Sequence, residues 1–96
     1  ISRFPSVRRD LAVIVDENLA VADLVETTRT AAGTLLKDII VFDIFTGKGI
    51  ETGLKSVALG LILQETSRTL TESEIDGVMS AVTVEISAKF NASIRE

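Results

Sequence analysis

The side chains best suited to chemistry in this sequence are concentrated in one stretch, residues 42–70. They comprise an aromatic ring, a carboxylate, two lysines and a serine hydroxyl, namely Phe45, Asp43, Lys48, Lys55 and Ser56. A ring can stack on an unpaired base, a carboxylate can accept hydrogen bonds from base edges, and lysines neutralise phosphates. This combination predicts a binding surface for single-stranded nucleic acid.

Two arginines near the start of the chain add to this predicted surface. Arg8 and Arg9 precede Asp10, and we expect one of them to pair with an acid and the other to face RNA. The sequence leaves open which arginine does which. Arg68, farther along, is more typical of a loop anchor than of a ligand contact. The net charge of the chain is −4, so we expect these cations to form a basic edge on an otherwise acidic body.

The composition leaves little room for catalysis. The chain has 96 residues, of which 46% are hydrophobic and 25% charged, and it contains no cysteine and no histidine. The usual zinc sites, disulfides and nucleophile–base pairs depend on those two residue types. Glu72 and Asp76 are expected on a solvated helix face. We therefore expect one domain, residues 1–96, that is not an enzyme by itself and binds no metal or cofactor.

The tripeptide Gly47-Lys48-Gly49 does not match a phosphate-binding P-loop. That motif requires a glycine where Phe42 stands and a helix directly after the loop. The tripeptide is instead typical of a flexible hairpin turn that displays Lys48 to solvent. In that position the lysine can still neutralise a phosphate.

Neither a membrane span nor a signal peptide is predicted. The longest apolar runs have the length of strands, and no secretory leader pattern opens the chain. Because the sequence starts at Ile1 without an initiator methionine, we expect it to be an excised piece of a longer protein.

The elements that must position the candidate side chains follow from the hydrophobic periodicity. Alternation and helical spacing predict a strand, a helix, two strands, a helix and a short strand, at residues 8–16, 21–32, 37–46, 55–65, 71–90 and 91–95. The second helix begins with a capping box, in which Thr71 is the N-cap and Glu74 reaches back to its amide. This order predicts an α+β, ferredoxin-like β-α-β-β-α-β fold, with a four-stranded antiparallel sheet and both helices on one face.

Alternation along the strands also predicts which side chains the helices cover. The covered face is expected to carry Leu11, Val13, Val15, Phe42, Ile44, Val57, Leu59 and Leu61. The uncovered face is expected to carry Asp10, Ala12, Ile14, Asp43, Phe45, Ser56, Ala58 and Gly60. Ile39, Val41 and Ile62 fall on the uncovered face as well, where we expect them to dock on the rest of a larger subunit or to drive weak dimerisation.

Five short motifs, taken together, resemble the ferredoxin-fold anticodon-binding domain at the C-terminus of the bacterial phenylalanyl-tRNA synthetase β subunit. They occupy residues 4–12, 42–45, 47–50, 53–56 and 68–71. The resemblance implies that Phe45 stacks on an anticodon base, although tyrosine is common at that position in the family. It also implies that Asp43 is the acceptor for base-edge donors.

The same resemblance implies partners and a location. The partners would be phenylalanine tRNA, the rest of the β subunit and the α subunit of the synthetase. ATP and Mg²⁺ would be used at a catalytic site elsewhere in that enzyme, with no cofactor in this domain. The protein would be cytoplasmic and would not associate with a membrane.

The same residues are also compatible with other functions. Phe45 is also compatible with packing against a neighbouring domain. An ACT-type domain shares the topology but binds amino acids at a glycine-rich turn after the first strand, where this chain has acidic residues 16–18. An acylphosphatase-like enzyme needs an arginine in that turn, whereas Arg8 and Arg9 lie at the start of the strand.

Overall fold

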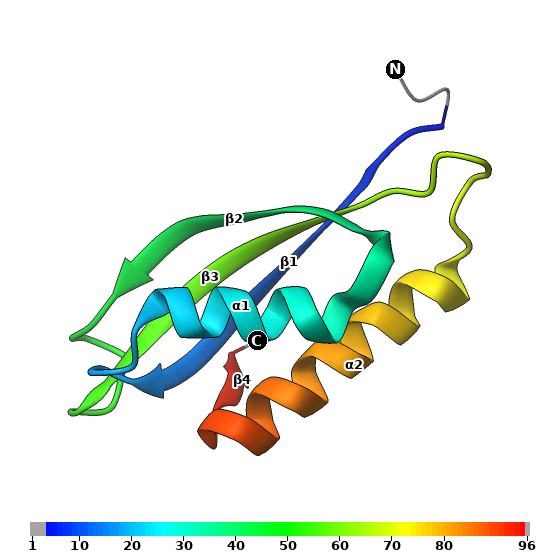
Figure 1. Cartoon of the computed structure of the whole chain (residues 1–96). Helices are drawn as coiled ribbons and strands as arrows, with labels where there is room; N and C mark the ends of the chain where they lie inside the picture. Colours follow the sequence, from blue (N-terminus) through cyan, green and yellow to red (C-terminus); the bar gives the residue numbers. More distant parts are fainter. Residues whose placement is uncertain (1–3, 96) are drawn as a thin grey trace.

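The computed structural model describes residues 4–95, in which two helices cover one face of an antiparallel sheet (Figure 1). In chain order the elements are β1 (Val7–Asp16), α1 (Val21–Ala32), a single 3-10 turn η1 (Gly33–Leu35), β2 (Leu36–Phe45), β3 (Leu54–Leu63), α2 (Glu72–Phe90) and β4 (Ser93–Arg95). The four strands are ordered β2-β3-β1-β4. The predicted β-α-β-β-α-β fold is therefore confirmed.

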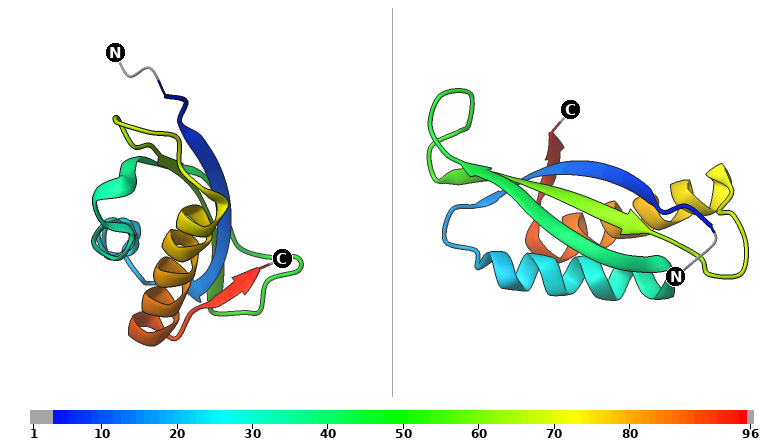
Figure 2. Two further views of the ribbon diagram at one scale, coloured as in Figure 1. Left: turned by 90° about the vertical axis from the view of Figure 1, so that its right-hand side faces the viewer. Right: turned by 90° about the horizontal axis from the view of Figure 1, so that it is seen from above.

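The core lies between the helices and the two central strands, β1 and β3. Val13, Val57 and Leu59 are fully buried on the strands, and the helices contribute Leu24 and Val82. Apolar side chains therefore alternate along β1 and β3 with residues that face the other way. Burial of one sheet face is the largest source of stability in this arrangement. Among the described residues, no helix lies on the opposite side of the sheet, which we call the open face (Figure 2).

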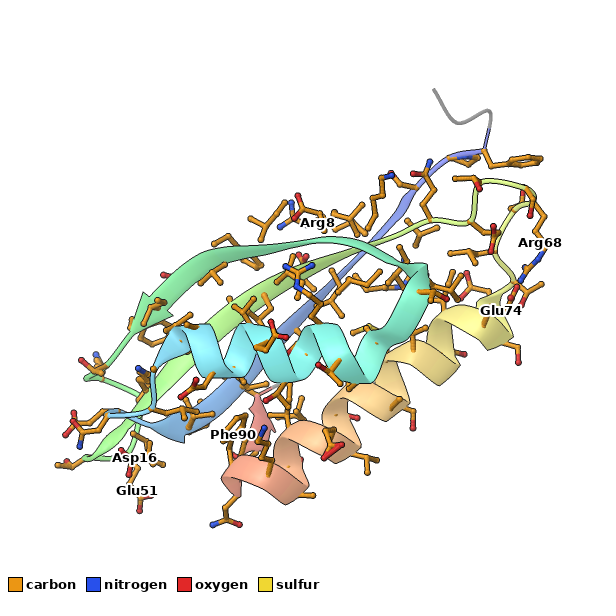
Figure 3. All side chains as sticks on the ribbon, in the orientation of Figure 1. Arg8, Asp16, Glu51, Arg68, Glu74 and Phe90 are labelled. Atoms are coloured by element: carbon orange, nitrogen blue, oxygen red, sulfur yellow. The ribbon has the colours of Figure 1, made fainter. Side chains whose placement is uncertain are left out.

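The predicted capping box at the start of α2 is confirmed, and Arg68 is the loop anchor that the sequence indicated. The backbone N–H of Glu74 donates to the Thr71 hydroxyl over 3.1 Å, and the Glu74 carboxylate accepts from the Thr71 N–H over 3.0 Å. Both terminal nitrogens of the Arg68 guanidinium also donate to that carboxylate, as Figure 3 shows. The hydrogen bonds from Arg68 and from the Thr71 backbone lower the pKa of Glu74 to about 2.

A bulge in β2 reverses part of the predicted face assignment. The register pairs Ile39 with Leu61 and Val41 with Leu59, so both side chains pack against the core and their predicted position on the open face is wrong. The register shifts between Val41 and Asp43, which leaves Phe42 as the extra residue. An inserted residue inverts the alternation along a strand.

Phe42 is consequently on the open face, not among the covered residues as predicted. Its ring contacts the guanidinium of Arg8, which extends over the open face at Gly60. Ile44 lies opposite Val57 in the register, on the helix side as expected, but its side chain is 48% exposed because β2 is an edge strand. Ile62 lies opposite Arg8 on the open face, as predicted.

Within residues 4–95, neither α1 nor α2 is long and apolar enough to cross a membrane.

Glu74→Gln should make the stability of the domain less dependent on pH in the acidic range. The folded-state pKa of Glu74, about 2, lies below its ordinary value of 4.5, so its ionised form stabilises the fold fully above pH 4.5. This contribution is lost as the pH falls from 4.5 towards 2. In thermal unfolding, the wild-type protein should have a higher Tm than the variant at neutral pH. This difference in Tm should shrink as the pH falls from 4.5 towards 2. Asp76→Asn, on an exposed position of the same helix, is the control; a difference that persists undiminished at pH 2 would contradict this account.

Candidate nucleic-acid interface

A shallow hollow of about 380 Å³ lies on the open face, and three of the seven predicted binding residues line it, namely Asp43, Phe45 and Ser56. Its floor is formed by small side chains from the central strands, Ala12, Ser56 and Ala58, and its rim by Phe42, Asp43, Phe45 and Arg95. The floor is low because these three residues, which alternate along β1 and β3 with buried core residues, have small side chains. The β2–β3 connection and the end of β4 project on the same side of the sheet in both views of Figure 2.

Phe45 lies on the open face, as predicted. It pairs with Ser56 in the β2–β3 register and is only partly buried. The guanidinium carbon of Arg95 lies 4.7 Å from the centre of the Phe45 ring, a cation–π contact that joins β4 to β2 across the hollow. A ring in this position is available to a flat ligand once Arg95 moves aside.

Asp43 and Ser56 flank the Phe45 ring in different ways. Asp43 pairs with Ala58 and is exposed at the rim, where its carboxylate is accessible to hydrogen-bond donors. Ser56 is only 2% exposed, since it lies on the floor of the hollow. The structure therefore places Asp43 where a ligand edge would approach and Ser56 beneath it.

The structure answers the question of which arginine faces the open side. Arg8 does: its Nε donates to the Asp10 carboxylate over 2.8 Å, and its guanidinium carbon is 5.1 Å from the centre of the Phe42 ring. Arg9 lies one position further along β1 and forms an ion pair with Glu72 at the start of α2, with a nitrogen–oxygen distance of 3.4 Å. Arg9 is thus directed to the helix side, away from the hollow.

The two predicted lysines do not lie together. Lys55 pairs with Val15 on the helix side of the sheet, and its ammonium donates to the Leu19 carbonyl over 2.6 Å. The expectation that both lysines surround one hairpin surface is therefore wrong, since strand alternation directs Lys55 to the opposite face. Lys48 is exposed in the β2–β3 connection, which projects on the open side (Figure 2).

Two residues of this site, Phe42 and Arg95, were missed by sequence reasoning. The bulge that brings Phe42 and Phe45 to one face has no signal in simple alternation. Arg95 had a usable signal: it is a cation on the last strand, and the register places it beside Ala12 of the open face. Pairing partners of such a short strand are set by tertiary structure, so the sequence alone did not identify it.

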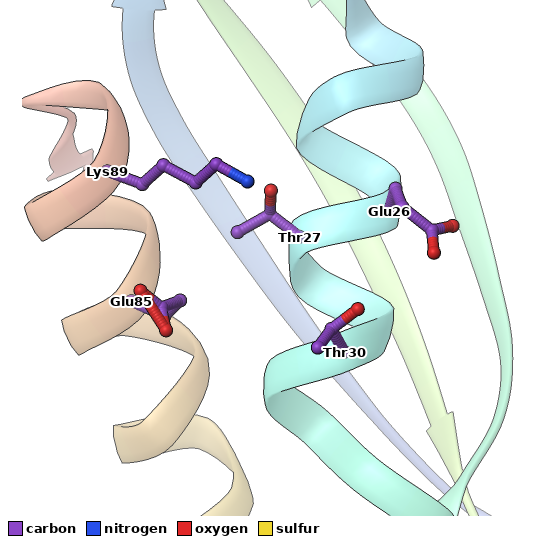
Figure 4. A pocket seen from close by; sticks show the side chains of 5 residues that line it. All are labelled: Glu26, Thr27, Thr30, Glu85 and Lys89. Atoms are coloured by element: carbon purple, nitrogen blue, oxygen red, sulfur yellow. The ribbon is translucent and has the colours of Figure 1, made fainter.

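Two other hollows are less suited to nucleic acid. One, of about 180 Å³, lies between the helices, where Lys89 of α2 extends towards Thr27 of α1 (Figure 4). Glu26 and Glu85 also line it, and carboxylates repel phosphates. The other, of about 290 Å³, lies under the β2–β3 connection and is likewise lined by acids, Glu17 and Glu51. Neither contains an aromatic ring.

Comparison with known proteins agrees with this geometry. The sequence profile of the ferredoxin-fold anticodon binding domain matches residues 2–95. Relatives include phenylalanine–tRNA ligase β subunits from Methylococcus capsulatus, 47% identical over 96 residues, and Vibrio cholerae, 48% identical over 96 residues, both covering 100% of this chain. The corresponding subunit of Xylella fastidiosa is 46% identical over 95 residues, or 99% of the chain.

The chain spans only 12% of the length of these relatives. The match nevertheless covers nearly every residue of the chain, including all strands and both helices of the described structure. The chain therefore belongs to the family of ferredoxin-fold anticodon-binding domains.

Proposed function

We propose that this domain contacts the anticodon region of phenylalanine tRNA as part of a phenylalanine–tRNA ligase β subunit. The observation that carries the proposal is the Phe45 ring, which lies on the open face beside an exposed carboxylate and above a floor of small side chains. Membership of the chain in a family of anticodon-binding domains supports RNA as the ligand. This membership favours an RNA ligand over the small molecule that an ACT-type domain would bind.

In the proposed complex an unpaired base replaces Arg95 on the Phe45 ring. The exposed cation–π contact contributes about 0.5–1 kcal/mol, whereas stacking of a base contributes about 1–3 kcal/mol. The displaced guanidinium keeps its charge and moves to a phosphate of the same RNA, so its interaction is exchanged and not lost. Arg95 thus protects the ring in the free domain and contributes to binding in the complex.

Asp43 gives the proposed site a preference among bases. A carboxylate close to RNA is repelled by phosphates, so it is tolerated best where it accepts hydrogen bonds from a base edge. The rim position of Asp43 allows this contact to a base that stacks on Phe45. Bases that present an N–H donor at that edge should therefore bind more tightly than those that present an acceptor.

The domain is proposed to bind and not to catalyse. The reaction with ATP and Mg²⁺ would take place elsewhere in the ligase, in the cytoplasm, with the remainder of the β subunit and the α subunit as partners. This chain has neither cysteine nor histidine, which agrees with a binding role. Its contribution to charging would be to increase affinity for the tRNA, a uniform binding effect that lowers KM more than it changes kcat.

Phe45→Ala in the full-length ligase should raise the KM for phenylalanine tRNA about 5- to 100-fold with little change in kcat, because one stacking contact is lost. Phe45→Tyr, which keeps the ring, should remain close to wild type. Ile44→Ala is a matched control, since Ile44 is an exposed neighbour on the helix side of the same strand. Steady-state aminoacylation kinetics provide the measurement, and an unchanged KM for Phe45→Ala would refute the stacking role.

Lys48→Met and Lys55→Met should separate an RNA contact from a structural one. Lys48→Met should make the slope of log affinity against log salt shallower by about 0.7, the value for one phosphate contact to a single strand. Lys55→Met should leave that slope unchanged and lower the free energy of unfolding by about 1–3 kcal/mol, because the hydrogen bond to the Leu19 carbonyl is lost. Filter binding at several salt concentrations and denaturant unfolding would test both; the reverse pattern would overturn the assignment.

A further inference from the structure

We propose that Phe42 and Arg8 form a second nucleotide position on the open face, which binds the unpaired nucleotide next to the one on Phe45. The inference rests on the proposed function and extends it from one stacked base to two. It begins from the exposure of Phe42, which is 48% exposed and lies outside the single core that the buried apolar residues form. Phe42 lies at the rim of the same hollow as Phe45, so the two rings form one apolar patch, and such a patch marks an interaction site.

The bulge in β2 brings Phe42 and Phe45 to the same face. Val41 and Ile44 lie on the helix side, and the register shift between Val41 and Asp43 leaves both Phe42 and Asp43 on the open face. In a regular strand, residues three positions apart face opposite sides, so without this shift only one of the two rings would lie on the open face. Bulges commonly redirect a side chain next to a binding site. Here the bulge brings Phe42 to the rim of the same hollow that Phe45 lines.

Arg8 is held beside Phe42 by two further contacts. Its Nε donates to Asp10, which uses one of its five N–H donors and leaves those on the terminal nitrogens for a ligand. Gly60 lies beneath it: a Cβ at that position would be 3.0 Å from both Nε and Nη2 of Arg8. Glycine at residue 60 therefore allows the guanidinium to lie close to the sheet and next to the ring.

The same chemistry occurs twice on the open face. Phe45 is paired with Arg95 at 4.7 Å, and Phe42 is paired with Arg8 at 5.1 Å. Each pair offers a ring for stacking and a permanent cation for a phosphate, which are the two requirements for binding a nucleotide of a single strand. Between them, the exposed Asp43 separates the two positions. Phe42 lines the hollow, and Arg8 lies beside it over Gly60, so both ring–guanidinium pairs belong to the same open face.

The test uses this chain and an anticodon stem-loop RNA of phenylalanine tRNA in which 2-aminopurine replaces each unpaired loop base in turn. Stacking on a ring changes the fluorescence of the probe. Wild-type protein should change the fluorescence at two neighbouring loop positions. Phe45→Ala should abolish the change at one of them, and Phe42→Ala should abolish it at the other and weaken binding at least about fivefold. Ile44→Ala, equally exposed but on the helix side, should alter neither.

The contribution of Arg8 to RNA binding is tested by a substitution at Gly60, the residue beneath its guanidinium. Gly60→Ala introduces a methyl group that displaces Arg8 without removing any contacting side chain, so it should weaken binding about as much as Arg8→Ala. In an Arg8→Ala background the Gly60→Ala substitution should have no additional effect on affinity. Circular dichroism and thermal unfolding of each variant verify that the fold is intact.

The outcomes distinguish this inference from the function on which it rests. If Phe45→Ala removes one fluorescence change and Phe42→Ala removes none, the second position is refuted and the anticodon-binding function stands. If Phe42→Ala leaves every RNA signal unchanged and instead weakens assembly of the full-length β subunit with the α subunit, Phe42 belongs to a protein interface. If wild-type protein changes no fluorescence at any position, both proposals fail.

Discussion

Packing of both helices against a single face of the sheet is the constraint on which the rest of this structure depends. The central strands β1 and β3 bury Val13, Val57 and Leu59 on that face, and strand geometry then directs every alternate residue to the other side. Four of those alternate positions hold small residues, namely Ala12, Ser56, Ala58 and Gly60, so the middle of this face carries no second core. The open face is consequently a low platform whose chemistry is set by the side chains at its edges.

The edge strands supply that chemistry. β2 contributes Phe42, Asp43 and Phe45, and β4 contributes Arg95, while Arg8 extends over the platform from β1. Edge strands are less constrained by packing than central ones, so a bulge is tolerated in β2, where it brings Phe42 and Phe45 to the same face. Stability and the proposed binding function thus depend on opposite faces of the same sheet. Substitutions on one face should affect mainly stability, and those on the other mainly RNA affinity.

Much of the fold was predictable because its signals are local. The capping box at Thr71 and Glu74 and the alternation in β1 and β3 follow from short-range chemistry, and both were confirmed. Alternation also placed Phe45 on the open face correctly. The assignments of Ile39, Val41 and Phe42 were wrong because a bulge inverts alternation in the middle of a strand, and its position depends on the partner strand.

The site was less predictable than the fold for the same reason. The Arg95–Phe45 contact joins residues fifty positions apart in the chain and exists only once β4 pairs with β1. The two neighbouring arginines, Arg8 and Arg9, looked equivalent in sequence, but strand alternation directs them to opposite faces. Lys55 was assigned to the hairpin surface, although it lies two positions before Val57 in the same strand and therefore shares the helix side with it. Sequence position alone does not determine which charges share a surface.

The most direct test of the one-faced platform is an NMR titration of the isotope-labelled domain with anticodon stem-loop RNA. Resonances of the open face should shift, above all the rings of Phe42 and Phe45 and the side-chain N–H groups of Arg8 and Arg95. Signals from the outward faces of α1 and α2 should stay in place. Shifts that concentrate on the helices and leave the two rings unaffected would contradict the account.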